Sequence, residues 1–280
     1  MSRIRPLAAA AVVAGAVAFP TASQARPADA VAHRSAPTKI TISGSTSVYP
    51  LTVSIAQAFV KKYPGVAKFT VLQGGSDTGI QDVAHKRVVI GASSRDLQQG
   101  DPGGLIGNKI ARDGVCVVTN SANSISNLSQ QQVQDIFSGK VRRWEDVPGA
   151  KVTGPIALIA RTNASGTQDA FRNIFMGPSL NVASTASQKA TNGLVQAAVR
   201  SDEHAIGYVD FRFTSGTYAV PYKGVGCTLR NAKSGQYPGI RNFWYLTNGK
   251  PTGVAKKFID YARSSSVQSS IVAKNYVTWH

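Results

Sequence analysis

The stretch that decides the fold lies near the start of the chain and reads Lys39-Ile-Thr-Ile-Ser-Gly-Ser-Thr-Ser-Val-Tyr-Pro-Leu51. Polar and apolar residues alternate over 39–42, as they do in a half-buried β-strand. Small and hydroxyl-bearing residues follow over 44–47, and apolar residues then recur at helical spacing until Tyr63-Pro64-Gly65 ends the helix. The order is therefore strand, polar loop, helix.

The same order recurs further along the chain. The strand Phe69-Thr-Val-Leu leads into Gly74-Gly-Ser-Asp-Thr-Gly and a helix that contains Ile80, and the strand Val88-Val-Ile-Gly ends in Ala92-Ser-Ser-Arg-Asp. Alternating strands and helices are typical of a parallel α/β sheet, whose ligands bind at the carboxyl ends of the strands. The sequence therefore predicts that these polar loops lie together.

A second set of elements begins with the buried strand Val115-Cys-Val-Val-Thr, and Ser129 is placed to cap the helix that follows. Further on, the strand Ile156-Ala-Leu-Ile releases the loop Arg161-Thr-Asn-Ala-Ser-Gly-Thr directly into another helix. An aromatic extended stretch at 237–247 then leads the chain back. We predict an α/β protein of two lobes, each a mostly parallel sheet flanked by helices. The predicted lobes are 38–114 together with 241–280, and 115–240.

The first 25 residues have the pattern of a secretory signal. Two arginines precede an uncharged apolar run over 7–19, which is too short to span a bilayer, and Ser23-Gln-Ala25 supplies the small residues that signal peptidase recognises. We predict cleavage after Ala25 and a disordered leader over 26–37, which is rich in Ala, Pro and Ser. No cysteine lies next to the cleavage site, where a lipid-anchored protein would have one, so we expect an exported, unlipidated protein, periplasmic or extracellular.

The charge of the chain favours anions as ligands. The 280 residues carry a formal net charge of +17, and removal of Arg3 and Arg5 with the signal leaves about +15. Such a field attracts anions in general. The basic residues are scattered, with no Lys/Arg-rich block and no aromatic-interleaved stripe, so we do not expect a nucleic-acid interface.

Cys116 and Cys227 are the only cysteines. An exported protein enters an oxidising compartment, where an even pair often forms a disulfide. Both residues also lie in apolar contexts, so two separately buried thiols are an equal alternative.

The four polar loops have the chemistry that an oxyanion requires. Backbone N–H groups at a helix start, the positive end of the helix dipole and short hydroxyl donors all favour a negative ligand. Any one of these loops is also an ordinary helix cap, and only their recurrence favours a binding site. Arg161 precedes Ser165-Gly-Thr and offers a planar, charged fork to the same anion. Arg95 either touches the ligand or forms an ion pair with Asp96, and we favour the ion pair.

These loops resemble the successive ligand loops of the phosphate-binding proteins of ABC importers. The resemblance rests on Gly44-Ser-Thr-Ser-Val-Tyr-Pro-Leu, Gly75-Ser-Asp-Thr-Gly-Ile, Ile90-Gly-Ala-Ser-Ser-Arg and residues 161–167, which follow one another in the same order. It implies a type II periplasmic-binding fold, with the ligand in the cleft between two closing lobes. It also implies a set of phosphate ligands, which in this sequence are Thr46, Ser47, Ser76, Ser94, Arg161, Ser165, Gly166 and Thr167.

One position departs from the family pattern. Well-known members have an Asp at the end of the third loop, where this sequence has Ser94. A buried carboxylate accepts the proton of hydrogen phosphate and repels sulfate, whereas a hydroxyl tolerates both. Asp77 is a candidate for the missing acceptor, and a solvated aspartate at a helix start is the alternative.

The competing functions are a broader oxyanion receptor, a secreted anion scavenger without a permease, and a secreted hydrolase. The hydrolase is disfavoured because no G-x-S-x-G elbow is present and none of the four histidines has an evident nucleophile partner. No metal-ligand spacing is present either. We therefore predict a monomeric receptor for phosphate or a similar oxyanion, not an enzyme, without cofactor or metal, that works with ABC permease subunits.

Overall fold

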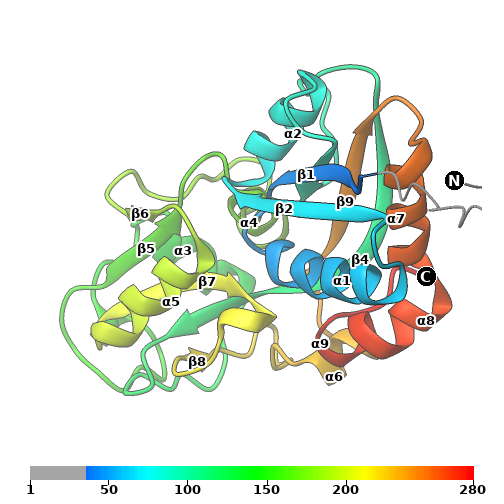
Figure 1. Ribbon diagram of the computed structural model, residues 1–280. Helices are drawn as coiled ribbons and strands as arrows, with labels where there is room; N and C mark the ends of the chain where they lie inside the picture. Colours follow the sequence, from blue (N-terminus) through cyan, green and yellow to red (C-terminus); the bar gives the residue numbers. More distant parts are fainter. Residues whose placement is uncertain (1–35) are drawn as a thin grey trace, which may run out of the picture. The chain divides into compact units, whose positions relative to one another are not determined.

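The computed structural model describes residues 36–280 (Figure 1). The predicted signal peptide, 1–25, and most of the predicted leader, 26–37, lie outside these residues. Regular structure begins at Thr38, one residue before the predicted first strand. Within the described range, no helix combines the length and the apolar character needed to cross a membrane.

The described strands form one mixed sheet in the order β2-β1-β3-β9-β4-β7-β5-β6, with β8 paired to β4. Their bounds are β1 Thr38–Gly44, β2 Ala67–Gln73, β3 Ile90–Ser93, β4 Leu105–Thr119, β5 Ala157–Arg161, β6 Ser187–Lys189, β7 Ala205–Asp210, β8 Tyr218–Ala219 and β9 Ile240–Asn248. β1 is parallel to β2 and β3, and β5 is parallel to β6 and β7. The carboxyl ends of these parallel strands carry the polar loops.

Two long antiparallel strands, β4 and β9, occupy the middle of the sheet. β4 pairs with β9 from Leu105 to Gly114 and with β7 from Val115 to Thr119, so one strand serves both halves of the sheet. The sequence predicts only the part of β4 that begins at Val115. The first ten residues of β4, which the sequence did not predict as a strand, include the glycine-rich end of the preceding loop. Pairing with β9 holds these residues in an extended conformation.

The helices pack against the sheet on both faces, and Figure 1 shows α1 and α2 on opposite sides of β1 and β2. The α-helices are α1 Tyr49–Lys62, α2 Ser76–Ala84, α3 Gln130–Phe137, α4 Gly166–Phe171, α5 Asn192–Ser201, α6 Leu229–Lys233, α7 Gly253–Arg263, α8 Ser265–Val267 and α9 Ala273–Asn275. The predicted cap of α3 is confirmed, because Ser129 Oγ accepts from the Gln132 N–H at 3.2 Å and the Gln132 side chain accepts from the Ser129 N–H at 2.8 Å.

Two hydrophobic cores support the two halves of the sheet. The first is centred on Phe59, whose ring contacts those of Phe69, Phe258 and Tyr261. The second contains the stacked rings of Phe171 and Tyr208 and the buried Trp144. We call the elements around these cores the first lobe and the second lobe. The buried members of the cores divide the chain between 111 and 115 and between 237 and 243. The predicted lobe boundaries stay a prediction.

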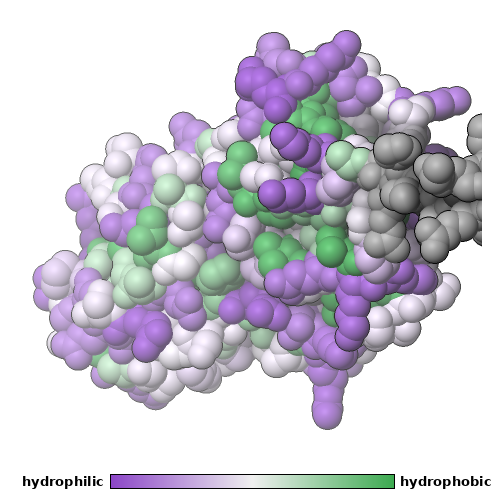
Figure 2. Space-filling model, in the orientation of Figure 1, coloured by the Kyte–Doolittle hydropathy of each residue, from purple (hydrophilic) through white to green (hydrophobic). Residues whose placement is uncertain are grey.

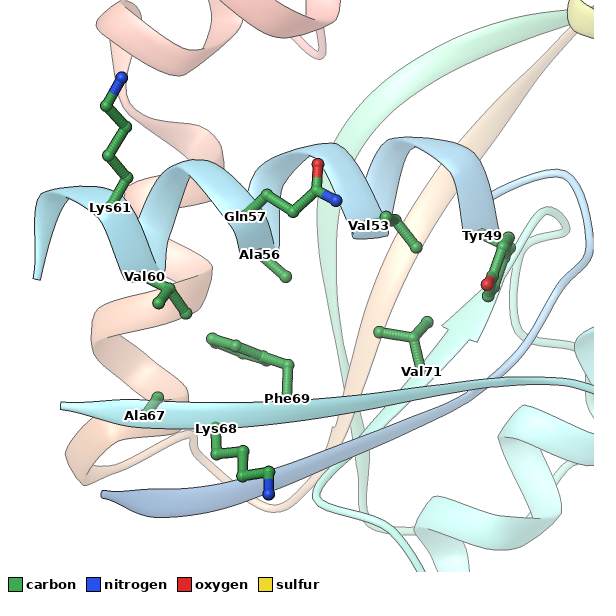
Figure 3. A pocket seen from close by; sticks show the side chains of 10 residues that line it. All are labelled: Tyr49, Val53, Ala56, Gln57, Val60, Lys61, Ala67, Lys68, Phe69 and Val71. Atoms are coloured by element: carbon green, nitrogen blue, oxygen red, sulfur yellow. The ribbon is translucent and has the colours of Figure 1, made fainter. Parts of the chain in front are cut away.

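An apolar groove of about 620 Å³ lies on the first lobe between α1 and β2. Figure 3 shows Val53, Ala56, Phe69 and Val71 facing one another across it, and Figure 2 shows hydrophobic residues gathered over α1 and β2 with hydrophilic residues around them. None of the predicted ligand residues lines this groove.

The structure joins Cys116 on β4 to Cys227 in a disulfide, the alternative that the sequence left open. The two Cα atoms lie 5.6 Å apart, and 111 positions separate the residues along the chain. The closed loop contains most of the second core. A disulfide that closes so long a loop removes many conformations from the unfolded chain.

We predict that replacement of both cysteines by alanine lowers the free energy of unfolding by up to about 5 kcal/mol, the chain-entropy value for a loop of this length. Urea unfolding followed by circular dichroism measures the difference. Wild-type protein unfolded in the presence of a reductant is the control and should match the variant. Coincident curves for the oxidised wild type and the variant would contradict this prediction.

Candidate ligand-binding site

The first polar loop places three buried hydroxyl groups at the end of β1. Ser45 Oγ accepts from the N–H groups of Ser47 and Val48 at 3.2 and 3.4 Å, and its own hydroxyl donates to Ser94 Oγ at 2.9 Å. Thr46 and Ser47 are 3% and 0% exposed. These bonds fix the turn into α1 and connect it to the third loop.

The second and third loops meet the first through Ser76 and Ser94. The Ser94 N–H donates to Ser76 Oγ at 3.0 Å, and the two hydroxyl oxygens lie 3.2 Å apart. Both side chains are buried. The parallel pairing of β1 and β3 brings these loops to one edge of the sheet, as the sequence predicts.

The fourth loop comes from the second lobe and touches the other three. Ser165 Oγ caps α4 by accepting from the N–H groups of Thr167 and Gln168. Thr167 Oγ1 lies 3.2 Å from Ser47 Oγ. Gly166 packs so closely on Ser76 and Ser94 that a Cβ atom at this position would collide with both hydroxyls. All eight residues predicted as ligands therefore lie in one cluster between the lobes.

Arg161 enters this cluster from the end of β5 and is 1% exposed. Its guanidinium donates to the carbonyls of Lys189 and Ala190, and weakly to the hydroxyls of Thr46 at 3.3 Å and Thr167 at 3.4 Å. Among the described residues, no carboxylate accepts a hydrogen bond from it. Burial and the nearby charge of Arg241 lower the pKa of Arg161 to about 10, so the group stays charged at neutral pH.

A second guanidinium, which the sequence did not predict, belongs to Arg241 on β9. It donates to Thr167 Oγ1 at 2.8 Å, Ser47 Oγ at 2.8 Å and Ser94 Oγ at 3.3 Å. The side chain of Arg241 on β9 therefore contacts three predicted ligand residues, which are Ser47 and Ser94 of the first lobe and Thr167 of the second lobe.

Two buried aspartates hold Arg241 in place. Asp113 is its direct partner across the β4–β9 pair and accepts from Nη2 at 2.9 Å, while Asp210 at the end of β7 lies 3.7 Å away. Both carboxylates are 0% exposed. Burial raises the pKa of each, and repulsion by the other carboxylate further raises that of Asp113, because two negative groups share one cation.

Asn192, the first residue of α5, links this ion cluster to the first loop. Its amide Nδ2 donates to Ser47 Oγ at 2.8 Å, Asp210 Oδ2 at 3.0 Å and Thr46 Oγ1 at 3.3 Å. In the sequence, Asp113 and Asp210 can be recognised as charged residues within largely buried strands, and Arg241 as a charged residue beside an aromatic strand segment. Asn192 has no such signal, because its neighbours in the sequence are not buried.

The prediction that Arg95 pairs with Asp96 is wrong. Arg95 pairs with Asp77 and Asp101 of its own lobe and with Asp169 of the second lobe, at 2.7, 2.7 and 3.0 Å. Asp96 offers Arg95 only its backbone carbonyl, because its carboxylate accepts from Asn242 and Trp244. Arg95 is therefore the centre of an ion-pair cluster at the rim of the site.

Comparisons with known proteins identify the family of this chain. The model of the PBP superfamily domain matches residues 31–266. The phosphate-binding protein PstS of Bacillus subtilis (strain 168) is 30% identical over 240 residues, which cover 83% of this chain and 78% of that protein. The chain belongs to the phosphate-binding proteins of ABC importers.

Solved structures of this family share the fold. A Clostridium perfringens protein, assigned as a phosphate ABC transporter substrate-binding protein and solved with bound phosphate, aligns with a TM-score of 0.80 and 32% identity over 87% of this chain and 100% of that chain. An ABC-type phosphate transport receptor from Vibrio cholerae aligns with a TM-score of 0.70 and 28% identity over 85% and 99% of the two chains. The predicted type II periplasmic-binding fold is confirmed, and the family consists of solute-binding proteins, not enzymes.

Within residues 36–280, no group of three or more His, Cys, Asp or Glu side chains is arranged to hold a metal ion. The candidate site contains hydroxyl groups, helix starts and two guanidinium groups. Such a set of donors suits a tetrahedral oxyanion, whose oxygens accept hydrogen bonds from every side.

We predict that Arg241→Met destabilises the ligand-free protein by about 3–5 kcal/mol, because it leaves two buried carboxylates without a cation. Arg241 attracts the ionised form of both carboxyl groups, so its removal should raise their folded-state pKa further than in the wild type. The folded variant then holds protons to higher pH than the folded wild type, and its stability falls more steeply as pH rises. The loss should therefore be larger at about pH 8 than at about pH 5.

Urea unfolding at the two pH values measures the effect. The matched control adds Asp113→Asn and Asp210→Asn to the same variant, which removes the unpaired charges and should restore part of the stability. If the loss in free energy of unfolding were the same at both pH values, the unpaired carboxylates would not be its cause.

Proposed function

We propose that this chain captures inorganic phosphate between its two lobes and delivers it to an ABC-type importer. The observation that carries the proposal is the convergence of the two buried guanidiniums, Arg161 and Arg241, on hydroxyl groups from both lobes. Arg241 contacts the hydroxyls of Ser47 and Thr167 at 2.8 Å, so first-lobe and second-lobe donors surround one position. Charge-assisted donors around one position favour a small, highly charged anion.

The ligand set proposed for phosphate has three kinds of donor. The hydroxyls of the first-lobe loops and the amides at the starts of α1 and α4 supply neutral donors, and the arginines supply charge. The residues are Thr46, Ser47, Ser76, Ser94, Arg161, Ser165, Gly166 and Thr167, to which we add Arg241. The bound phosphate in the Clostridium perfringens relative supports this choice of anion.

Capture requires that the lobes separate to admit the anion and then close. Two glycines permit the close approach. A Cβ atom at Gly75 would meet the Ala164 carbonyl, and one at Gly166 would meet Ser76 and Ser94. The ion pair of Arg95 with Asp169 and the bond from the Asp77 N–H to the Ala164 carbonyl, at 3.2 Å, join the lobes at the rim. These contacts form only when the lobes meet, so they would favour the closed state.

Export and docking to permease subunits complete the proposed function. The N-terminal sequence has the pattern of a signal peptide, and the relatives named above are parts of phosphate transport systems. Co-purification with permease subunits would separate a transport receptor from a secreted scavenger, which needs no membrane partner.

We predict that Arg161→Ala weakens phosphate binding by about 100-fold or more, since it removes a buried charged donor. Calorimetric titration of protein stripped of ligand by partial unfolding measures the change. Arg230→Ala, which removes an exposed arginine on α6, is the control and should bind as the wild type does. If the wild type produced no heat with phosphate, the proposed function would be wrong.

We also predict that Gly166→Ala weakens phosphate binding by at least about tenfold, because the added methyl group holds the lobes apart and lengthens hydrogen bonds to the anion. The thermal stability of the ligand-free protein should change little. Gly193→Ala on α5, where a Cβ atom meets no neighbour closer than 3.8 Å, is the matched control. Equal affinity of the two variants would argue against closure onto the ligand.

A further inference from the structure

A hollow of about 360 Å³ lies at the end of the first lobe opposite the ligand loops. It is lined by the start of β1, the end of α2, the segment before β3 and the turn from β9 to α7. The seven residues of β1 separate this hollow from the loop that carries Thr46 and Ser47. At about 3.3 Å per residue the separation is roughly 20 Å. A ligand in the hollow therefore leaves the phosphate cleft free.

Three lysines and no carboxylate line the hollow. Lys39, Lys86 and Lys250 are exposed, and none of them forms an ion pair with a carboxylate of residues 36–280. The carboxylates of the two adjacent helices, Asp82 on α2 and Asp260 on α7, already pair with other cations. The positive charge of the hollow therefore has no counter-charge in the described chain.

The fold itself does not favour two of these lysines. Lys39 on β1 and Lys68 on β2 are register partners, so two like charges lie side by side on one face of the sheet and repel each other. Lys86 has a φ of 58°, in the left-handed region where a helix usually ends with glycine. Both arrangements cost free energy in the protein alone. An anion in the hollow would offset this cost.

The positive charge continues from the hollow onto the opposite face of the sheet. Lys61 and Lys62 in the last turn of α1 and Lys257 on α7 are all exposed, and the Lys257 ammonium lies 3.9 Å from the ring centroid of Tyr63. Figure 3 shows Lys68 on the side of β2 away from α1, and Lys61 on the side of α1 away from β2. The lysines therefore surround the end of the lobe and do not lie in one plane. A flexible polyanion can follow such a surface, whereas a flat membrane contacts only part of it.

The chemistry of lysine favours a polymer of phosphate groups over a single ion. A lysine ammonium binds phosphate as a point charge, but one exposed ion pair is weak and is screened by salt. A chain of phosphates contacts several lysines at once and releases their counterions together. No aromatic side chain lines the hollow, so it lacks the stacking surface on which proteins bind single-stranded nucleic acid.

We propose that this end of the first lobe binds a linear phosphate polymer without bases, and that the hollow with Lys39, Lys86 and Lys250 holds it. The site is separate from the cleft, so the proposal goes beyond the proposed function and does not depend on it. A polymer bound at this end leaves the ligand loops exposed to solvent and the lobes free to close.

The test measures binding of long-chain inorganic polyphosphate to three proteins by calorimetry at several salt concentrations. They are the wild type, a hollow variant and a control variant. The hollow variant carries Lys39→Gln, Lys86→Gln and Lys250→Gln, and the control variant carries Lys140→Gln, Lys151→Gln and Lys223→Gln in the second lobe. Each variant loses three exposed lysines, and each includes one residue of positive φ, Lys86 or Lys223. The two variants therefore have the same net charge and differ in where it is lost.

The hollow variant should bind polyphosphate at least about tenfold more weakly than the wild type, because three phosphate contacts are lost. The slope of log affinity against log salt concentration should become shallower by about 2, at about 0.7 per contact for a single-stranded polyanion. The control variant should differ from the wild type by less than about threefold, since screening limits distant charges. Both variants should bind orthophosphate in the cleft as the wild type does.

Four results would overturn the proposal. Equal losses in the two variants would show that only the net charge of the protein attracts the polymer, and a wild type that does not bind polyphosphate would show that the site does not exist. Displacement of the polymer by excess orthophosphate would place the chain end in the cleft. Tighter binding of single-stranded oligothymidylate, or of phosphatidylglycerol vesicles, would make this end a nucleic-acid or a membrane surface. The orthophosphate titration tests the proposed function separately in every case.

Discussion

The guanidinium of Arg241 is the group on which the centre of this molecule depends. It lies on β9, pairs with Asp113 on the neighbouring strand β4, and reaches hydroxyl groups of both lobes. A buried cation requires such partners, and the partners require the cation. The position at which the lobes are joined and the position proposed for the ligand are therefore one ion cluster.

Two guanidinium groups and two carboxyl groups share this cluster, and burial raises the pKa of both carboxyls, so negative charge is not in excess before any ligand is considered. Two buried arginines, Arg161 and Arg241, face two buried aspartates, Asp113 and Asp210. A binding site of this kind attracts an anion through the field of the whole basic protein, but it holds the anion through hydrogen bonds from many neutral donors. Hydrogen-bond direction then decides which anion fits, because each buried donor or acceptor must find a partner.

The loops and the fold class could be predicted from the sequence, because a strand, a hydroxyl-rich loop and a helix start are adjacent along the chain. Ser76, Ser94 and Thr167 were found in this way. Asp113 and Arg241 were not, because they are 128 positions apart and meet only through the register of β4 and β9. No local pattern records such a register.

The partner of Arg95 illustrates the same limit. Adjacency along the chain suggested Asp96, but the carboxylate of Asp96 bonds to Asn242 and Trp244 of β9. The true partners of Arg95 include Asp169, which comes from another lobe. The chain bends at Ser94 and Arg95, after the end of β3, so the side chains of Arg95 and Asp96 reach different partners although the residues are adjacent in the sequence.

The pairing of β4 with β9 also sets an order in which the chain can fold. The second core lies within one continuous segment, so it can form before the C-terminal part of the chain is present. The first core includes residues from both ends of the described chain, and its completion requires β9, whose partners on β4 lie 126 to 143 positions earlier in the chain. Before β9 pairs with β4, the guanidinium of Arg241 does not lie between Asp113 and Asp210. β9, the last strand along the described chain, thus supplies both the partner that completes the sheet and the cation at the centre of the proposed site.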